Sequence, residues 1–221
     1  MNNPILICGC PGGGTSLVTK MLRYAGMFAG ADAGPCEARK YHESNAFVEA
    51  NRTFLNQTIA FPHAPKSALQ FTTHIERSGK DLVQLASLVD KEDLLANYWA
   101  GAQRNTVWGW KDPRNSANAL IWRSLFPELR VLVIHRKWSR TMRAELGKSD
   151  AGIWFRKEST KDLRRLYYDP PGIEGLDRFD VDFDRLIEGA DEFEATLRWC
   201  GLSDEPVKDY RAFLEQVGLE S

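Results

Sequence analysis

Short runs of consecutive apolar residues predict the strands of this chain. Residues 5–8 and residues 130–135 carry the clearest runs, which are typical of strands buried on both faces, as in parallel sheets. Residues 107–110 form a third candidate strand. Apolar and charged residues alternate over residues 178–183, and this alternation is typical of an edge strand.

Between these strands, apolar residues recur at intervals of three and four and predict helices. Because strands alternate with helices, the pattern indicates an α/β fold with a mainly parallel central sheet. We expect a single domain over residues 1–221, built as a three-layer sandwich with a mainly helical insertion at about residues 44–102. The predicted helices begin near residues 15, 44, 82, 94, 116, 139, 191 and 206.

Polar residues suited to helix N-termini mark several of these starts. Ser44 or Asn45 is expected to cap the helix that follows it. Ser116 and Ser139 are expected to cap the helices before and after the strand at residues 130–135.

The composition and charge exclude some classes of protein. Lys and Arg number 29 and Asp and Glu number 30, and a net charge of −1 gives no general attraction to nucleic acid or to an anionic membrane. No apolar run approaches the ~18 residues of a membrane span, and the first residues lack the basic segment of a signal peptide. The four cysteines have neither zinc nor thioredoxin spacing, so we expect reduced thiols in the core. These features favour a cytoplasmic protein with no nucleic-acid or membrane partner, and they leave its oligomeric state open.

A glycine-rich segment, residues 9–16, links the first predicted strand to the first helix. It reads Gly-Cys-Pro-Gly-Gly-Gly-Thr-Ser, the G-x-x-x-x-G frame of a P-loop followed by two hydroxyl residues. Glycines let backbone N–H groups turn toward one point, and a helix N-terminus adds free N–H groups and a partial positive charge. The segment therefore predicts a cradle for a phosphate or sulfate group. A tight turn without a ligand is the alternative, but three consecutive glycines lose more backbone entropy than such a turn requires.

The frame departs from the Walker A motif at Thr15, which stands where that motif has lysine. An ATPase or kinase needs this cation at the β- and γ-phosphates. A P-loop kinase for a small molecule is therefore the second interpretation of the loop and not the first.

Several segments, in order, resemble the P-loop sulfotransferase family, which uses 3′-phosphoadenosine 5′-phosphosulfate (PAPS). Residues 9–17 resemble the family's G-x-P-[RK]-S-G-T-[ST]-L loop. Residues 108–114, Trp-Gly-Trp-Lys-Asp-Pro-Arg, resemble the W-G-W-K-D-P-R of many bacterial members and are the most specific match. Residues 125–136 resemble the family's F-P-x-x-x-x-[VI]-x-[VI]-x-R segment. Residues 41–44 and Asn51 resemble its G-[YF]-[FW]-E segment and the asparagine downstream of it.

The resemblance implies a P-loop-type fold and PAPS as sulfuryl donor, with no obligatory metal. The glycine-rich loop would hold the 5′-phosphosulfate, and Lys111 would neutralise charge on the leaving oxygen. Arg136 would bind the 3′-phosphate, because a guanidinium fork is suited to bidentate phosphate contacts. The donor-binding residues so implied are Pro11, Gly12, Gly13, Gly14, Thr15, Ser16, Arg136 and Ser139.

The sequence departs from the family pattern at three donor-binding positions. Gly12 and Gly13 stand where the family's loop has Arg or Lys and Ser. Ala144 stands where the family has a serine eight residues after the arginine. The nearby candidates to replace the missing donors are Ser139, Lys137, Arg140 and Arg143.

The general base has three candidates in one stretch of the chain. Glu43 matches the family's glutamate, His42 is adjacent to it, and Glu37 lies in the same loop. Adjacent residues usually point apart, so we expect only one of Glu43 and His42 to face the site. The alternatives without function are a glutamate that favours the start of a helix, and Lys111 as a surface lysine paired with Asp112.

The sequence thus predicts an enzyme that transfers a sulfuryl group from PAPS to a hydroxyl or amine of a small-molecule or glycan acceptor. A catalytically degenerate nucleotide-binding protein of the same fold is a further alternative. Residues 30–102 and 148–177 are expected to shape the acceptor pocket. We expect Trp108 and Trp110, on one face of their strand, to belong to the core.

Overall fold

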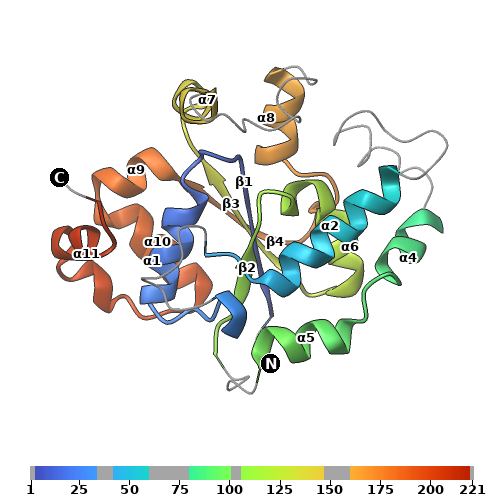
Figure 1. The fold of residues 1–221 in the computed structure, drawn as a ribbon. Helices are drawn as coiled ribbons and strands as arrows, with labels where there is room; N and C mark the ends of the chain where they lie inside the picture. The colour runs from blue at the N-terminus through green and yellow to red at the C-terminus, as the bar shows by residue number, and fades with distance from the viewer. Residues whose placement is uncertain (1–2, 34–41, 60–79, 101–105, 147–159, 220–221) are drawn as a thin grey trace.

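The computed structural model describes residues 3–33, 42–59, 80–100, 106–146 and 160–219 of the chain (Figure 1). Its centre is a four-stranded sheet in the order β2-β1-β3-β4, and every pair of neighbouring strands is parallel. The α/β fold predicted from the sequence is thereby confirmed. The strands are β1 (Ile5–Gly9), β2 (Gly109–Lys111), β3 (Arg130–His135) and β4 (Asp177–Asp182).

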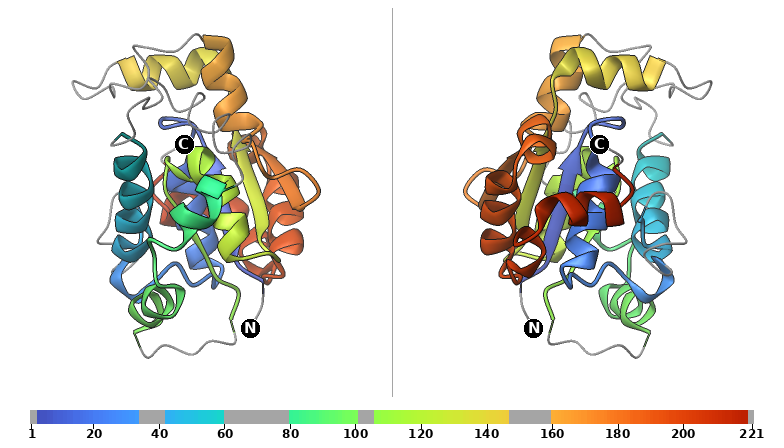
Figure 2. Two further views of the ribbon diagram at one scale, coloured as in Figure 1. Left: turned by 90° about the vertical axis from the view of Figure 1, so that its right-hand side faces the viewer. Right: turned by 90° about the vertical axis from the view of Figure 1, so that its left-hand side faces the viewer.

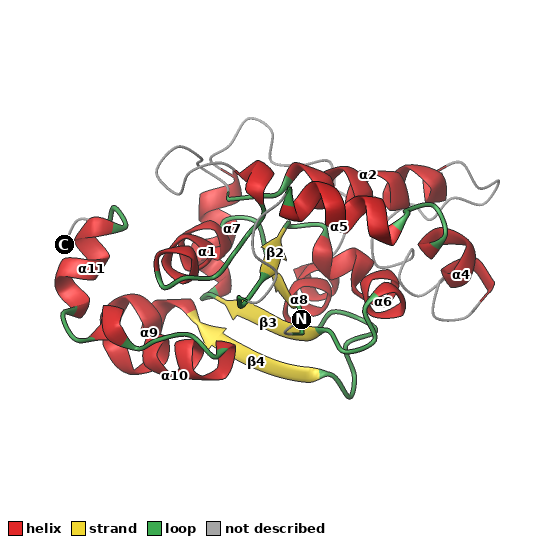
Figure 3. Cartoon of the chain, turned by 90° about the horizontal axis from the view of Figure 1, so that it is seen from below, coloured by secondary structure: helices red, strands yellow, loops and turns green. Residues whose placement is uncertain are grey.

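Helices cover both faces of this sheet and make a three-layer sandwich (Figures 2 and 3). One face packs against α1, α9, α10 and α11, and the other against α6 and α8, with α2, α4 and α5 in the same apolar cluster. The helices before β3 are α1 (Thr15–Tyr24), α2 (Asn45–Ile59), α4 (Lys80–Ala86), α5 (Lys91–Trp99) and α6 (Asn115–Leu125). The helices after β3 are α7 (Trp138–Leu146), α8 (Thr160–Tyr168), α9 (Phe183–Glu188), α10 (Ala190–Cys200) and α11 (Tyr210–Gln216).

Alternation along the strands divides the core into two clusters. In β3, Val131 and Val133 face the α6 and α8 side, whereas Leu132 and Ile134 face the α1 side. Trp108 and Trp110 are buried on the α6 and α8 side, as the sequence predicted for core residues. The alternation also fixes the direction of the polar side chains that follow each strand.

Two predicted caps are wrong, because each serine lies inside its helix and not before it. Ser116 is the second residue of α6, which is preceded by a turn in which the Asp112 carboxylate accepts the Arg114 N–H. Ser139 is an exposed residue inside α7, and the N–H of Lys137 just before that helix donates to Asp184.

At the start of α2, the cap comes from a residue that is distant in the sequence. The carboxylate of Asp32 accepts the Ala46 N–H at 2.8 Å and the Ser44 hydroxyl at 2.7 Å. Ser44 therefore orients the capping carboxylate. Asp32 belongs to a 3₁₀ turn (Ala31–Ala33), so this contact ties the loop after α1 to the start of α2.

Two element boundaries also differ from the sequence prediction. The helical spacing of apolar residues in the first helix continues to Phe28, but the helix ends at Tyr24 and Phe28 pairs with Trp108 in an isolated β-bridge. Phe183 begins α9, because the Asp182 side chain accepts the Asp184 and Arg185 N–H groups and starts a helix there. Among the described residues, every helix is too short or too polar to cross a lipid bilayer.

Candidate functional site

The carboxyl ends of three adjacent strands carry the polar residues singled out in the sequence. β1 ends in the glycine-rich loop, β2 ends at Lys111, and Arg136 follows the last residue of β3. Because β1 lies between β2 and β3 in a parallel sheet, these three features share one edge. Ligands of open α/β sheets bind at this edge. Lys111 and Arg136 also lie on the same face, since Trp110 and His135 before them point to the other.

The loop between β1 and α1 has a backbone that requires glycine. Gly12 and Gly14 have φ values of 75° and 92°, in the left-handed region. A Cβ at Gly14 would lie 2.2 Å from the ring of Phe183, so space as well as conformation excludes a side chain. The Gly13 N–H donates to the Cys10 carbonyl at 2.8 Å and closes the turn.

The start of α1 directly follows this turn. Gly14 is the N-cap residue and supplies no side-chain oxygen to the first-turn N–H groups. Thr15 is buried, whereas Pro11 and Ser16 are half-buried at the loop surface. A helix N-terminus that follows a glycine turn is suited to hold a phosphate or sulfate group.

Arg136 closes the loop from the side of β3. Its Nη1 donates to the Gly12 carbonyl at 2.9 Å, and its guanidinium lies 5.0 Å from the centroid of the Phe183 ring. Its Nε lies 3.9 Å from Asp184 and is buried without a hydrogen-bond partner among the described residues. The guanidinium is therefore held at the loop, with a quarter of the arginine side chain exposed.

Lys111 lies beside β1 and forms a short ion pair with Glu43. The Lys111 Nζ to Glu43 Oε1 distance is 2.6 Å, and only 2% of the lysine side chain is exposed against 21% for the glutamate. The alternative pairing of Lys111 with Asp112 is not observed, because Asp112 binds Arg114 at 2.7 Å. Lys111 is thus a buried cation at the sheet edge, and the Glu43 carboxylate that pairs with it is partly accessible.

His42 points to a different partner from Glu43, as expected for neighbouring residues. Its Nδ1 lies 3.0 Å from the Arg23 guanidinium, which can only donate, so the ring proton belongs on Nε2. Burial and the nearby charges of Arg23, Lys20 and Lys111 lower the pKa of His42 from 6.5 to about 4. His42 is therefore neutral at pH 7 and a weak proton acceptor.

A buried asparagine network behind this edge was only partly visible in the sequence. Asn115 donates to the carbonyls of Ile7 in β1 (3.0 Å) and Trp110 in β2 (3.3 Å). Its side-chain oxygen accepts from Asn51 at 2.9 Å. Asn115 thus joins the two strand ends that carry the loop and Lys111. The sequence singled out Asn51 by resemblance, but nothing marked Asn115 except its place just after the Lys-Asp-Pro-Arg segment.

Asp112 was also missed as a buried charge next to the site. Its side chain is fully buried, and Oδ2 has no hydrogen-bond partner among the described residues. Burial raises the pKa of the Asp112 carboxyl, against the opposing effect of Arg114. The Asp112–Arg114 pair fixes the turn between β2 and α6 and with it the end of β2.

Of the remaining predicted residues, Ser139 is the one whose place the structure describes, and it is not part of this cluster. Ser139 is exposed in the first turn of α7. Position 144 lies within α7, and Glu37 lies outside the described residues. Within the described ranges, no cluster of three or more His, Cys, Asp or Glu residues is placed to hold a metal ion.

We compared the chain with known protein families, curated proteins and solved structures. No protein-family model, no curated protein and no solved structure matches the chain.

Proposed function

We propose that this protein is a sulfotransferase that moves a sulfuryl group from PAPS to a hydroxyl or amine of a small-molecule or glycan acceptor. The main support for the proposal is that the glycine-rich loop, Lys111 and Arg136 lie at the same edge of a parallel sheet. Such a transfer requires positioning and charge stabilisation more than covalent chemistry by the protein. A loop of N–H groups between two cations provides both.

Each part of the donor would meet a different part of this edge. The backbone of residues 12–16 would hold the 5′-phosphosulfate at the start of α1. Arg136 would bind the 3′-phosphate through the exposed quarter of its side chain. Lys111 would lie against the oxygen that bridges phosphorus and sulfur.

The reaction forms a bond between the acceptor oxygen or nitrogen and sulfur and breaks the bond between sulfur and the bridging oxygen. The leaving group is 3′-phosphoadenosine 5′-phosphate, whose developing charge Lys111 would neutralise. The proton of the acceptor would pass to Glu43. A bound donor would compete for the Lys111 ammonium, which pairs with Glu43 in the free protein, and would release the carboxylate for this role.

Glu43 is a better candidate for the base than His42. The histidine has a pKa of about 4, and Arg23 occupies its Nδ1. Its Nε2 proton is a hydrogen-bond donor and suits a positioning role.

A nucleotide-binding protein without transferase activity is the second candidate. Gly12 and Gly13 favour it, because they give the loop neither the cation nor the hydroxyl that the resembling family has there. The kinase interpretation has less support, because Thr15 replaces the Walker lysine and is buried.

Thermal unfolding with 3′-phosphoadenosine 5′-phosphate, AMP and Mg·ATP tests the donor site. A ligand at about 100 times its Kd stabilises the folded state by about 2.7 kcal/mol. For a chain of this length we expect the bisphosphate to raise Tm by roughly 5–11 °C. AMP, which lacks the 3′-phosphate, should produce a much smaller rise.

Arg136→Gln should remove most of the difference between the bisphosphate and AMP. Arg185→Gln is the matched control, since 70% of the Arg185 side chain is exposed on α9. A rise with Mg·ATP alone would contradict the proposal and favour the kinase. Bisphosphate binding without transfer to any of a broad acceptor panel would favour the second candidate.

A further inference from the structure

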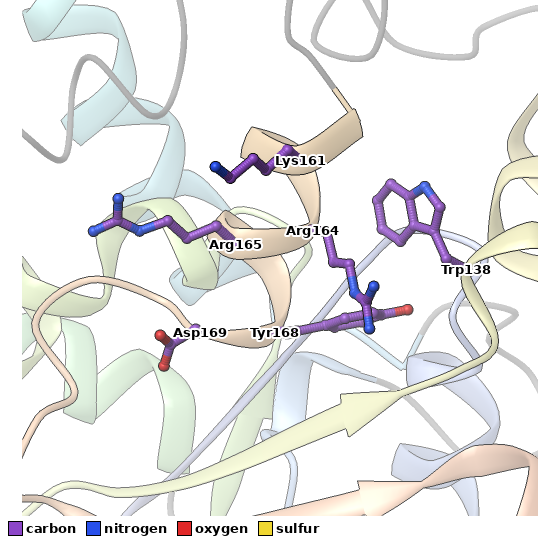
Figure 4. A pocket seen from close by; sticks show the side chains of 6 residues that line it. All are labelled: Trp138, Lys161, Arg164, Arg165, Tyr168 and Asp169. Atoms are coloured by element: carbon purple, nitrogen blue, oxygen red, sulfur yellow. The ribbon is translucent and has the colours of Figure 1, made fainter.

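A cavity of about 630 Å³ lies between the start of α7 and helix α8 (Figure 4). This volume is within the range of small-molecule binding sites, roughly 300–1,000 Å³. In the figure, the side chains of Lys161, Arg164 and Arg165 all extend from α8, and that of Arg164 reaches toward Tyr168. The lining residues are Trp138, Lys161, Arg164, Arg165, Tyr168 and Asp169.

The lining carries a surplus of positive charge. Among the described residues, no carboxylate forms an ion pair with Lys161, Arg164 or Arg165. Asp169, the acidic residue of the lining, is engaged by Arg178 at 2.9 Å. Three basic side chains therefore share a cavity in which the carboxylate is already neutralised.

The folding of α8 explains this arrangement only in part. Lys161 stands three residues before Arg164 and four before Arg165, spacings at which like charges repel and destabilise a helix. A lysine in the first turn also opposes the helix dipole, whereas Asp162 in the same turn and Arg165 in the last turn favour it. The burial of Leu163, Leu166 and other apolar residues holds the helix on the sheet regardless of these charges. A bound anion would turn the repulsion into attraction.

The cavity adjoins the candidate donor site but lies on the other face of the sheet. The Tyr168 hydroxyl donates to the Arg136 carbonyl at 2.8 Å, so both lie at the same end of β3. The Arg136 guanidinium points away from the cavity, to Gly12 and Phe183 on the α1 side. Tyr168 instead packs with Trp138 and His135 on the α6 and α8 side.

We propose that this cavity binds an anionic group of the acceptor, such as a phosphate, sulfate or carboxylate carried next to an apolar ring or chain. Trp138 and Tyr168 would contact the apolar part of the acceptor. The basic side chains of α8 would contact its negative charge. The acceptor so defined is an elongated anion whose reacting hydroxyl or amine reaches the glycine-rich loop. The assignment to the acceptor rests on the proposed function, whereas the binding of an anion by the cavity does not.

Calorimetric titration with phenyl phosphate tests the cavity, with phenol as the neutral control. The titrations are made at fixed ionic strength with 3′-phosphoadenosine 5′-phosphate present at saturation, so that the donor site is filled. We expect phenyl phosphate to bind and phenol to bind at least ten-fold more weakly. The double variant Lys161→Gln/Arg164→Gln should lose at least ten-fold in affinity for phenyl phosphate and keep its affinity for the bisphosphate. Arg211→Gln, an exposed arginine on α11, should stay within two-fold of the wild type in both.

Three outcomes would overturn the proposal for different reasons. If the bisphosphate excludes phenyl phosphate, or the double variant loses bisphosphate affinity, the cavity belongs to the donor site. Equal affinity of wild type and double variant for phenyl phosphate would show that the cavity is not the binding site. Binding of phenyl phosphate with no bisphosphate binding would remove the proposed function and the acceptor assignment together, and would leave an anion site alone.

Discussion

At the residue scale, the pairing of Lys111 with Glu43 defines the chemistry of the site. A buried lysine needs a negative partner, because the removal of an isolated charge from water is costly. The carboxylate of Glu43 fills this need at 2.6 Å in the free protein. In the proposed reaction, substrates would separate these two side chains. Lys111 would then contact the leaving oxygen, and Glu43 would accept the proton of the acceptor.

Glu43→Gln should separate the two candidate bases. The amide oxygen can still accept from Lys111, but the amide cannot take up the proton and no longer balances the buried ammonium charge. We expect transfer from PAPS to slow by roughly 10²–10⁴-fold, the usual contribution of general acid–base catalysis. Release of 3′-phosphoadenosine 5′-phosphate with a fixed acceptor panel measures the rate, and calorimetry checks that donor affinity is unchanged.

His42→Asn is the matched variant for this comparison. Asparagine tolerates the φ of 52° that His42 adopts, so the backbone is not strained. We expect its transfer rate to stay within a few-fold of the wild type. A large loss in His42→Asn with little loss in Glu43→Gln would assign the base to the histidine.

At the element scale, the link between β1 and α1 depends on close contact with α9. Phe183 begins α9 and fills the space beside Gly14 that a side chain would need. The Arg136 guanidinium lies on the ring of Phe183 and bonds to Gly12. The loop is therefore shaped by segments from both halves of the chain.

Gly14→Ala should show how much the loop contributes to donor binding. The change combines an unfavourable positive φ with a Cβ 2.2 Å from the Phe183 ring, so the turn must open. Gly26→Ala is the control, because its φ is +101° and no atom lies within 4 Å of its Cβ. The control should lose only the roughly 1–2 kcal/mol of left-handed strain.

We expect Gly14→Ala to lower Tm more than Gly26→Ala and to abolish the rise of Tm with 3′-phosphoadenosine 5′-phosphate. Gly26→Ala should keep that rise in full. An undiminished rise in a folded Gly14→Ala variant would place the anion site elsewhere.

At the scale of the whole molecule, the sequence predicted the described strands and the order of the fold well. The runs at 5–8 and 130–135 correspond to β1 and β3, because strands buried between two helical layers have no exposed face to interrupt the apolar run. What the sequence missed depends on contacts between distant segments. Asp32 capping α2 and Asn115 joining two strands have no local pattern, since their partners are far away in the chain. The motifs marked the glycine-rich loop, Lys111 and Arg136 at strand ends, but the pairing of Lys111 with Glu43 was not predicted, because Lys111 could also have met Asp112.

The stability of the whole molecule should depend on the protonation of His42. Its pKa is about 4 in the folded state and about 6.5 in the unfolded chain, so the unfolded state binds more protons between these values. The free energy of unfolding therefore rises with pH from about 4 to 6.5 and is flat above. When the pH falls from 7 to 5, the effect of His42 should lower the free energy of unfolding by about 2 kcal/mol and Tm by roughly 4–8 °C.

The comparison of wild type and His42→Asn isolates this effect from other titrations. Three carboxyl groups also have shifted pKa values, those of Asp177, Asp180 and Asp184. Burial would raise these pKa values, but hydrogen bonds and nearby cations outweigh it and lower them. The three carboxylates therefore stop stabilising the folded state only below about pH 4. The wild type should lose roughly 4–8 °C more than His42→Asn when the pH falls from 7 to 5. Equal losses would mean that His42 charges freely in the folded state and that its contact with Arg23 does not persist in solution. In that case its proton would be available to the site, and the preference for Glu43 as base would lose its main support.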